Sequence, residues 1–247
     1  TLTEIRKKRE TLEENSCQVS LSLARRAFEE YIQVMAVYSD NSLDGEENYR
    51  LFWKTLDYAG PMLRGEGFTP ILAVEGGRLL CGKLDRLEKL RDAGVKILTL
   101  VWGGECCVGG AHDTSVGLTP FGREVVEGCF DLGIVPDLSH ASDRLFEEVV
   151  SLAEERKSPV IASHSCSRAL FPHPRNLTDE MAKKIARLGG VIGVNLFPHH
   201  LGGGTLETVC RHILHLASAV GEDRVCLGGD LDGVSVLPDG IRTVADL

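Results

Sequence analysis

Several features that mark common classes of protein are missing from this chain. None of its apolar runs is long enough to span a lipid bilayer as a helix. No patch combines clustered Lys and Arg with aromatic residues, and the formal net charge is −9. Because phosphate binding needs clustered positive charge, the sequence argues against nucleic acid as a partner, and it predicts no membrane segment.

Motifs of several enzyme and metal-binding classes are absent as well. The eight cysteines form no C-x-x-C pair, which argues against a zinc ribbon, and their apolar surroundings favour free thiols in a cytoplasmic protein over disulfides. There is no G-x-S-x-G elbow for a serine nucleophile and no G-x-x-x-x-G-K-[ST] phosphate loop. No expected strand ends in lysine, so none is placed to form a Schiff base.

The chain alternates instead between short apolar segments and amphipathic segments. The short segments are rich in Val, Ile and Leu and mostly continuous, as in strands buried on both faces of a parallel sheet. They cover residues 31–39, 70–76, 95–102, 133–140, 159–164, 190–197 and 224–230. With no linker between them, these units predict one domain of the α/β class, a (β/α)8 TIM-type barrel with one unit missing. A doubly wound open sheet is the alternative.

The amphipathic segments carry the signals of helices that cover a sheet. In the segment from 178 to 190, Thr178 is placed as the N-cap, acidic residues fill the first turn, and two glycines end the helix. The segments at 142–157 and 205–221 follow the same plan, with apolar residues at spacings of three and four.

Polar side chains recur where the expected strands end. In a βα barrel these ends converge on one mouth, where catalytic groups project. The residues at the strand ends are Glu75, Trp102, Asp137 with His140, His164, Asn195 and Asp230. Histidine and carboxylate are natural ligands of Zn²⁺ and similar ions. Two histidines with Glu75 and Asp230 at equivalent positions therefore predict a metal site rather than isolated structural histidines.

Seven short motifs resemble, in order, those of the membrane (renal) dipeptidase family of zinc-dependent (β/α)8 peptidases. They are AVEGG at 73–77, GLTPFGREVV at 117–126, DLSHAS at 137–142, ASHS at 162–165, HPRNLTDE at 173–180, GGVIGVN at 189–195 and GGDLDGV at 228–234. The similarity extends from about residue 15 to the end of the chain. It implies a metal-dependent dipeptidase in which a hydroxide bridging two zinc ions attacks the peptide bond of a dipeptide.

The resemblance also implies roles for individual residues. Glu75 would bridge two zinc ions, and His140 and His164 would be metal ligands. Arg175 would hold the substrate's terminal carboxylate, for which its planar fork is suited, and Asp230 would handle the proton. We place two further residues in the substrate site, Asn176 next to Arg175 and Trp102 at the end of its strand.

The chain departs from the family pattern in two places. The family opens with a His-x-Asp pair that supplies ligands of the other ion, and no such pair occurs here before residue 112. We therefore expect residues 1–247 to be a single, truncated barrel domain without its first strand and final helix, whose own ligands suffice for one of the two ions. Dipeptidase activity is expected of the complete protein, in which the first-strand ligands are present. The second departure is Trp102, which stands where the family has a substrate-contacting histidine, and His112 is the candidate substitute.

Two other functions stay open at this stage. One is a non-catalytic barrel that binds peptides or a partner protein, and the other is a related metal-dependent hydrolase of amides or lactones. A barrel without one strand leaves two unpaired sheet edges, so we expect the isolated chain to be less stable and to associate, for example as a homodimer.

Overall fold

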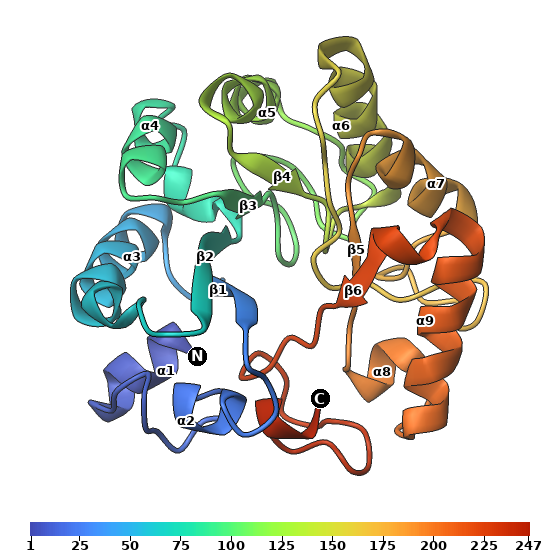
Figure 1. Ribbon diagram of the computed structural model, residues 1–247. Helices are drawn as coiled ribbons and strands as arrows, with labels where there is room; N and C mark the ends of the chain where they lie inside the picture. The colour runs from blue at the N-terminus through green and yellow to red at the C-terminus, as the bar shows by residue number, and fades with distance from the viewer.

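The computed structural model describes residues 1–247, and its strands form a curved, parallel wall in sequence order (Figure 1). The strands are β1 (Tyr31–Tyr38), β2 (Phe68–Glu75), β3 (Ile97–Thr99), β4 (Val135–Asp137), β5 (Ile192–Val194) and β6 (Val225–Leu227). The first four pair in parallel as one sheet, and β5 pairs in parallel with β6. Single parallel bridges from Asp137 to Ile161 and from Ala162 to Ile192 link the two sheets.

This wall surrounds a centre at which the strands' carboxyl ends meet, and most helices lie outside it (Figure 1). The α-helices are α1 (Leu2–Lys8), α2 (Leu21–Ala24), α3 (Gly45–Ala59), α4 (Asp85–Asp92), α5 (Pro120–Leu132), α6 (Asp143–Arg156), α7 (Asp179–Arg187), α8 (Pro198–Leu201) and α9 (Leu206–Val220). The 3-10 turns are η1 (Gly60–Met62), η2 (Gly77–Leu80), η3 (Glu222–Arg224) and η4 (Val244–Asp246). The barrel arrangement is as the sequence predicts, and β6 does not pair with β1.

From β3 onward, the strands are shorter than their apolar runs indicate. The run at 95–102 forms a ladder only over Ile97–Thr99, and the run at 159–164 contributes only its two single bridges. The residues beyond each ladder turn into the mouth loops. There, side chains rather than neighbouring strands form hydrogen bonds with some of their backbone groups. The amide of Ser163, for example, donates to a carboxylate oxygen of Asp137 at 2.8 Å.

Local sequence explains where the outer helices begin. The side chains of Thr119, Ser142 and Thr178 accept hydrogen bonds from backbone amides in the first turns of α5, α6 and α7. The predicted N-cap at Thr178 is therefore confirmed. Met181 and Ile185 on α7 are buried as expected, within one apolar core that fills the space between helices and strands.

Glycine is required where the strand ends approach one another. A Cβ atom added to Gly193 would lie 2.0 Å from the backbone oxygen of Ser163, and one added to Gly228 would lie 2.1 Å from the same oxygen. Gly193 in β5 and Gly228 just after β6 thus allow their backbones to pack directly against Ser163, the residue before His164.

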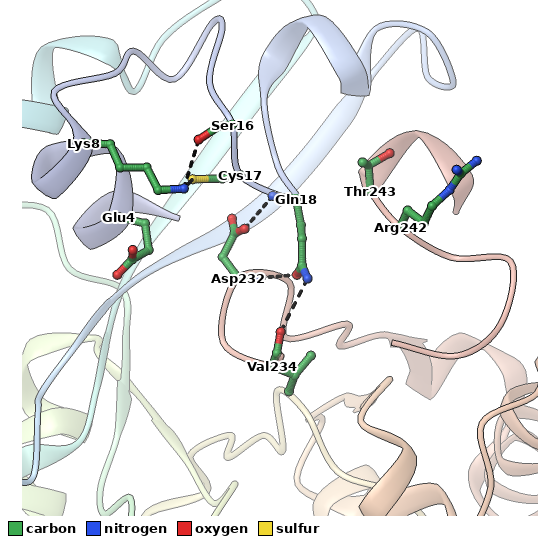
Figure 2. Close-up of a pocket in the computed structure, with 9 residues that line it drawn as sticks. All are labelled: Glu4, Lys8, Ser16, Cys17, Gln18, Asp232, Val234, Arg242 and Thr243. Atoms are coloured by element: carbon green, nitrogen blue, oxygen red, sulfur yellow. Dashed lines mark hydrogen bonds between the residues drawn. The ribbon is translucent and has the colours of Figure 1, made fainter. Parts of the chain in front are cut away.

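The first and last segments of the chain meet beside β1 (Figure 2). Asp232 accepts a hydrogen bond from the amide of Gln18 at 2.6 Å, and its own amide donates to the Gln18 side chain at 2.6 Å. A polar cavity of about 410 Å³ lies here, and none of the predicted site residues lines it.

All eight cysteines are unpaired. Among the helices, none combines the length and apolar character that a bilayer crossing requires.

Candidate metal centre

Three of the predicted ligands come from different parts of the barrel wall. Glu75 is the last residue of β2, His140 lies three residues beyond β4, and His164 follows the bridge at Ala162. His140 has a left-handed backbone with φ of 70°, which is uncommon for a residue other than glycine. Its carbonyl accepts the amide of His112 at 2.7 Å, so the mouth loop after β3 helps to hold this conformation.

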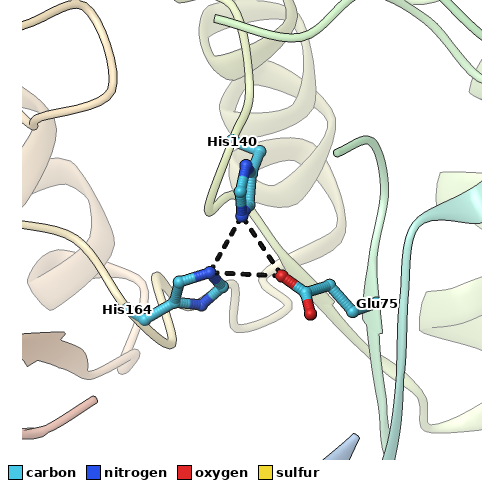
Figure 3. Close-up of side chains that lie close together, drawn as sticks. All are labelled: Glu75, His140 and His164. Carbon is cyan, nitrogen blue, oxygen red and sulfur yellow. Dashed lines mark hydrogen bonds and ion pairs between the residues drawn. The ribbon is translucent and has the colours of Figure 1, made fainter. Parts of the chain in front are cut away.

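The three side chains meet at one point (Figure 3). Oε1 of Glu75 lies 3.2 Å from Nε2 of His140 and 3.3 Å from Nε2 of His164, and the two nitrogens are 2.9 Å apart. Ligand atoms about 2.0–2.1 Å from a tetrahedral zinc ion stand roughly 3.3 Å from one another. The triangle is slightly tighter than that spacing. Its donor types and dimensions fit a divalent ion with one coordination position left open, and this is the only such cluster in the chain.

The buried carboxylate of Asp137 orients the ligand His164 through Ser163, on the side of the imidazole away from the cluster. Asp137, which is 1% exposed, accepts hydrogen bonds from the hydroxyls of Thr99 and Ser163, each at 2.6 Å. Ser163 Oγ in turn lies 2.8 Å from Nδ1 of His164, while the hydroxyl of Ser139 accepts the His164 amide at 3.0 Å. An Asp137–Ser163–His164 chain of this kind fixes the orientation of the imidazole whose Nε2 faces the centre.

The protonation of the trio follows from burial and mutual charge. Burial opposes ionisation of Glu75, but hydrogen bonds from His140 and His164 hold its pKa below the usual range. Burial, helped by the charge of Arg175, lowers the pKa of His140 to about 3. Burial and Arg175 also disfavour a charge on His164, yet the carboxylates of Asp230 and Glu75 outweigh them and raise its pKa. Without a metal the site therefore holds an ionised glutamate and a neutral His140.

Arg175 is buried beside this centre without an ionic partner. It is 3% exposed, and its two terminal nitrogens donate to Ser165 Oγ and to the His164 carbonyl, each at 2.8 Å. Its Nε has no hydrogen-bond partner, and no carboxylate lies within ion-pair distance of the guanidinium. A buried, unpaired guanidinium is costly, and a bound anion would offset that cost.

Asp230 stands at the mouth with a left-handed backbone, φ of 52°. Burial raises the pKa of its carboxyl to about 6, with the ionised Glu75 acting in the same direction and the charges of His164 and Arg175 opposing. A carboxyl in this range takes up and releases a proton near neutral pH, as acid–base catalysis requires.

The other predicted site residues lie at the mouth in different settings. The Trp102 ring is 37% exposed and sits 5.9 Å from the His140 ring and 5.1 Å from the Tyr38 ring. The His112 ring also lies 5.9 Å from that of His140. Asn176 is 1% exposed, and its amide nitrogen donates to the backbone oxygens of Phe171 and His200. It therefore ties the loop that contains Phe171 to α8.

Two groups of residues around the cluster received no role from the sequence. Asp137 stood out at a strand end, but only the fold reveals that it joins Thr99, Ser163 and the backbone of Ser139 behind the ligands. A signal was present in the repeated Ser-His pairs at 139–140 and 163–164. The second group is His173 and His200, whose rings lie 5.0 Å apart at the mouth.

Known proteins resemble this chain in both sequence and fold. The family model described as membrane dipeptidase (peptidase family M19) matches residues 17–247. An uncharacterized dipeptidase of Schizosaccharomyces pombe is 31% identical over 185 residues, which cover 71% of this chain and 44% of the yeast protein. The chain thus spans less than half the length of that relative.

Two solved structures share the barrel and are 25% identical to this chain. One is the dipeptidase AC, a metallopeptidase of family M19, with a TM-score of 0.88 over 99% of this chain and 86% of the other. The other is a metallopeptidase from Rhodobacter sphaeroides liganded with a phosphinate mimic of the dipeptide L-Ala-D-Ala, with a TM-score of 0.87 over 100% of this chain and 87% of the other. The fold is therefore that of the M19 barrel, and the doubly wound alternative is excluded.

Proposed function

The chain belongs to the membrane dipeptidase family, peptidase family M19, and we propose that it is a zinc-dependent dipeptidase acting at the Glu75–His140–His164 centre. The observation that carries the proposal is this cluster, in which a carboxylate and two imidazole nitrogens converge within 3.3 Å. The Rhodobacter relative, which binds a mimic of a dipeptide, supports the substrate class.

Glu75, His140 and His164 would hold the metal. When bound, zinc supplies Lewis-acid chemistry and lowers the pKa of water at the site to near neutrality. Glu75 contacts both histidines through Oε1 alone and turns its second oxygen away from them (Figure 3), so that oxygen is free for a second ion. The residues of this cluster would hold one ion, and a second ion sharing Glu75 would need further ligands that the cluster does not supply.

Arg175 would bind the C-terminal carboxylate of the substrate. Its unpartnered Nε–H and the remaining hydrogens on its terminal nitrogens leave a fork of donors without ionic partners. A carboxylate is the planar anion that such a fork accepts in a bidentate manner. Because Arg175 donates to the backbone of His164, it would place the substrate at a fixed offset from the metal ligands. Trp102 would form a wall of this substrate site, and Asn176 would hold its loops.

Asp230 would move the proton. With its pKa near 6, it is mostly ionised at neutral pH and able to accept a proton from water. The same carboxyl, once protonated, would return that proton to the leaving amine. We propose that these residues all belong to one catalytic barrel domain, of which residues 1–247 form a truncated part.

A hydrolysis assay tests the proposal. The zinc-loaded full-length protein is incubated with a panel of dipeptides, and released amino acids are quantified for the wild type and for the matched Glu75→Gln and Glu124→Gln variants. Glu124 lies on α5, away from the cluster. We expect hydrolysis that is lost in Glu75→Gln and kept in Glu124→Gln. A protein that binds zinc yet cleaves no dipeptide would refute the proposal and leave a non-catalytic, peptide-binding barrel.

A further inference from the structure

Two consecutive cysteines lie in the mouth loop between β3 and α5. Cys106 and Cys107 are half-buried, and they begin a tight turn that an antiparallel bridge between Glu105 and Gly110 closes. Across this turn the amide of Cys106 donates to the Gly109 carbonyl at 2.9 Å. The closed turn therefore holds the two thiol side chains in a fixed relative position, and both remain partly open to solvent.

The two thiols interact directly. The Cys107 thiol donates a hydrogen bond to the sulfur of Cys106, and the backbone amides of Val108 and Gly109 donate to that same sulfur. The sulfur of Cys107 lies 3.7 Å from the carbonyl oxygen of Gly77, whose partial negative charge favours the protonated thiol at this position. The surroundings thus treat the two sulfurs differently, with donors around Cys106 and an acceptor beside Cys107.

This asymmetry sets the protonation of the pair. The hydrogen bond from Cys107 lowers the pKa of Cys106 to about 6, with the two backbone amides and the charge of Arg78 acting in the same direction and burial opposing them. The same hydrogen bond, together with burial, raises the pKa of Cys107. At neutral pH the pair therefore holds one thiolate and one thiol in contact.

The pair lacks the surroundings of a metal site. No third His, Cys, Asp or Glu ligand atom converges with the two sulfurs, because the cluster of Glu75, His140 and His164 is the only one of its kind in the chain. A thiolate that is accessible and lies next to a second thiol has instead the arrangement of an oxidisable dithiol. The thiolate is the form that oxidants attack, and the neighbouring thiol can resolve the product.

We propose that Cys106 and Cys107 form an oxidation site for hydroperoxides. The Cys106 thiolate attacks one peroxide oxygen, the O–O bond breaks, hydroxide leaves, and Cys106 becomes a sulfenic acid. The Cys107 sulfur then attacks the Cys106 sulfur and the S–O bond breaks. The departing hydroxide takes the proton of the Cys107 thiol and leaves as water. The two sulfurs are joined in a disulfide, and the peroxide has accepted two electrons.

The disulfide formed in this way is readily reversed. Consecutive Cα atoms are about 3.8 Å apart, which is closer than the Cα atoms that most disulfides join. The ring that closes between neighbouring cysteines is therefore strained, and strained disulfides are the easily reduced ones. A modest excess of a thiol reductant should restore both cysteines.

Mass spectrometry of the zinc-loaded full-length protein tests the site without reference to its activity. The protein is exposed to equimolar hydrogen peroxide at about pH 6, free thiols are blocked with N-ethylmaleimide, and the peptide that contains both cysteines is analysed before and after reduction. The Cys107→Ser variant is treated in the presence of dimedone, which traps sulfenic acids, and its serine keeps a hydrogen-bond donor next to Cys106. Cys210 is the internal control, because it is exposed on α9 and lies outside the loop.

We expect the wild-type peptide to lose two hydrogens on oxidation and to take up two blocking groups after reduction. In Cys107→Ser, dimedone should label Cys106 at least about tenfold more than Cys210, because an ordinary thiol is almost wholly protonated at this pH.

Three results overturn the proposal. The first is a peroxide-treated wild type in which Cys106 and Cys107 both still take up the blocking reagent. The second is dimedone labelling of Cys106 no greater than that of Cys210. The third is a disulfide from Cys106 to Cys81, whose backbone amide lies against the Cys107 sulfur, because it would assign the resolving role to another thiol.

Discussion

Replacing Arg175 with methionine is expected to abolish the preference for peptides with a free C-terminal carboxylate. The guanidinium already donates to Ser165 and to the His164 carbonyl, which leaves Nε–H and one hydrogen on each terminal nitrogen for a ligand. Two charge-assisted hydrogen bonds to a carboxylate contribute about 3 kcal/mol after desolvation is deducted. Since about 1.4 kcal/mol corresponds to a factor of ten, the interaction amounts to roughly a hundredfold in kcat/KM.

The assay compares a dipeptide with its C-terminal amide, in both the wild type and the variant. We expect the wild type to favour the free acid about a hundredfold and Arg175→Met to treat both substrates alike. Arg175→Lys keeps the charge without the planar fork, so it should recover only part of the preference. Zinc content and a thermal melt establish that each variant is folded and loaded. An equal loss of rate on acid and amide would refute the role of Arg175 in carboxylate binding and leave it a purely structural one.

Three further predictions concern the surroundings of the site. Ser163→Ala removes the hydrogen bond to Nδ1 of His164 and should weaken zinc binding about 10–100-fold in a chelator-competition titration, whereas unchanged affinity would contradict the orienting role. The raised pKa of Asp230 means that the folded state holds this proton more tightly, so stability falls as pH rises from about 4 to 6. In urea unfolding of the metal-free protein, Asp230→Asn should therefore be more stable than wild type by up to about 3 kcal/mol at pH 7.5 and nearly equal to it at pH 4, and a pH-independent difference would argue against the shift. Gly193→Ala places a Cβ atom 2.0 Å from the Ser163 oxygen and should lower the free energy of unfolding by about 2–3 kcal/mol, while Gly204→Ala, whose Cβ would meet nothing closer than 3.9 Å, should change it little.

The sequence predicts the barrel because the physics of its strands and helices is local. Continuous apolar runs and capped amphipathic segments gave seven βα units, and the caps at Ser142 and Thr178 are present. The lengths of the strands could not be read in this way. Ile161 and Ala162, for example, lie in a strong apolar run and yet form only single bridges, because pairing depends on the twist and register of neighbouring strands.

The ligand set was predictable once the barrel was, because the carboxyl ends of the strands of a barrel converge on one mouth. Glu75, His140 and His164 do meet there. The network behind them was not predictable, because it depends on side-chain directions across strands, as in the bond from Thr99 to Asp137. The setting of Asn176 was equally hidden. Its amide nitrogen donates to backbone oxygens of a loop and of α8, and only the packing of these two segments determines that arrangement.

The central claim is that Glu75, His140 and His164 bind a metal ion. The most direct test measures zinc content and zinc affinity for the wild type, for His140→Ala and His164→Ala, and for the control His215→Ala. His215 pairs with Asp179 at 2.8 Å between α9 and α7, away from the cluster. We expect wild type and His215→Ala to bind zinc alike, and the other two variants to lose at least about a hundredfold in affinity. Undiminished zinc binding by His140→Ala and His164→Ala would contradict the account.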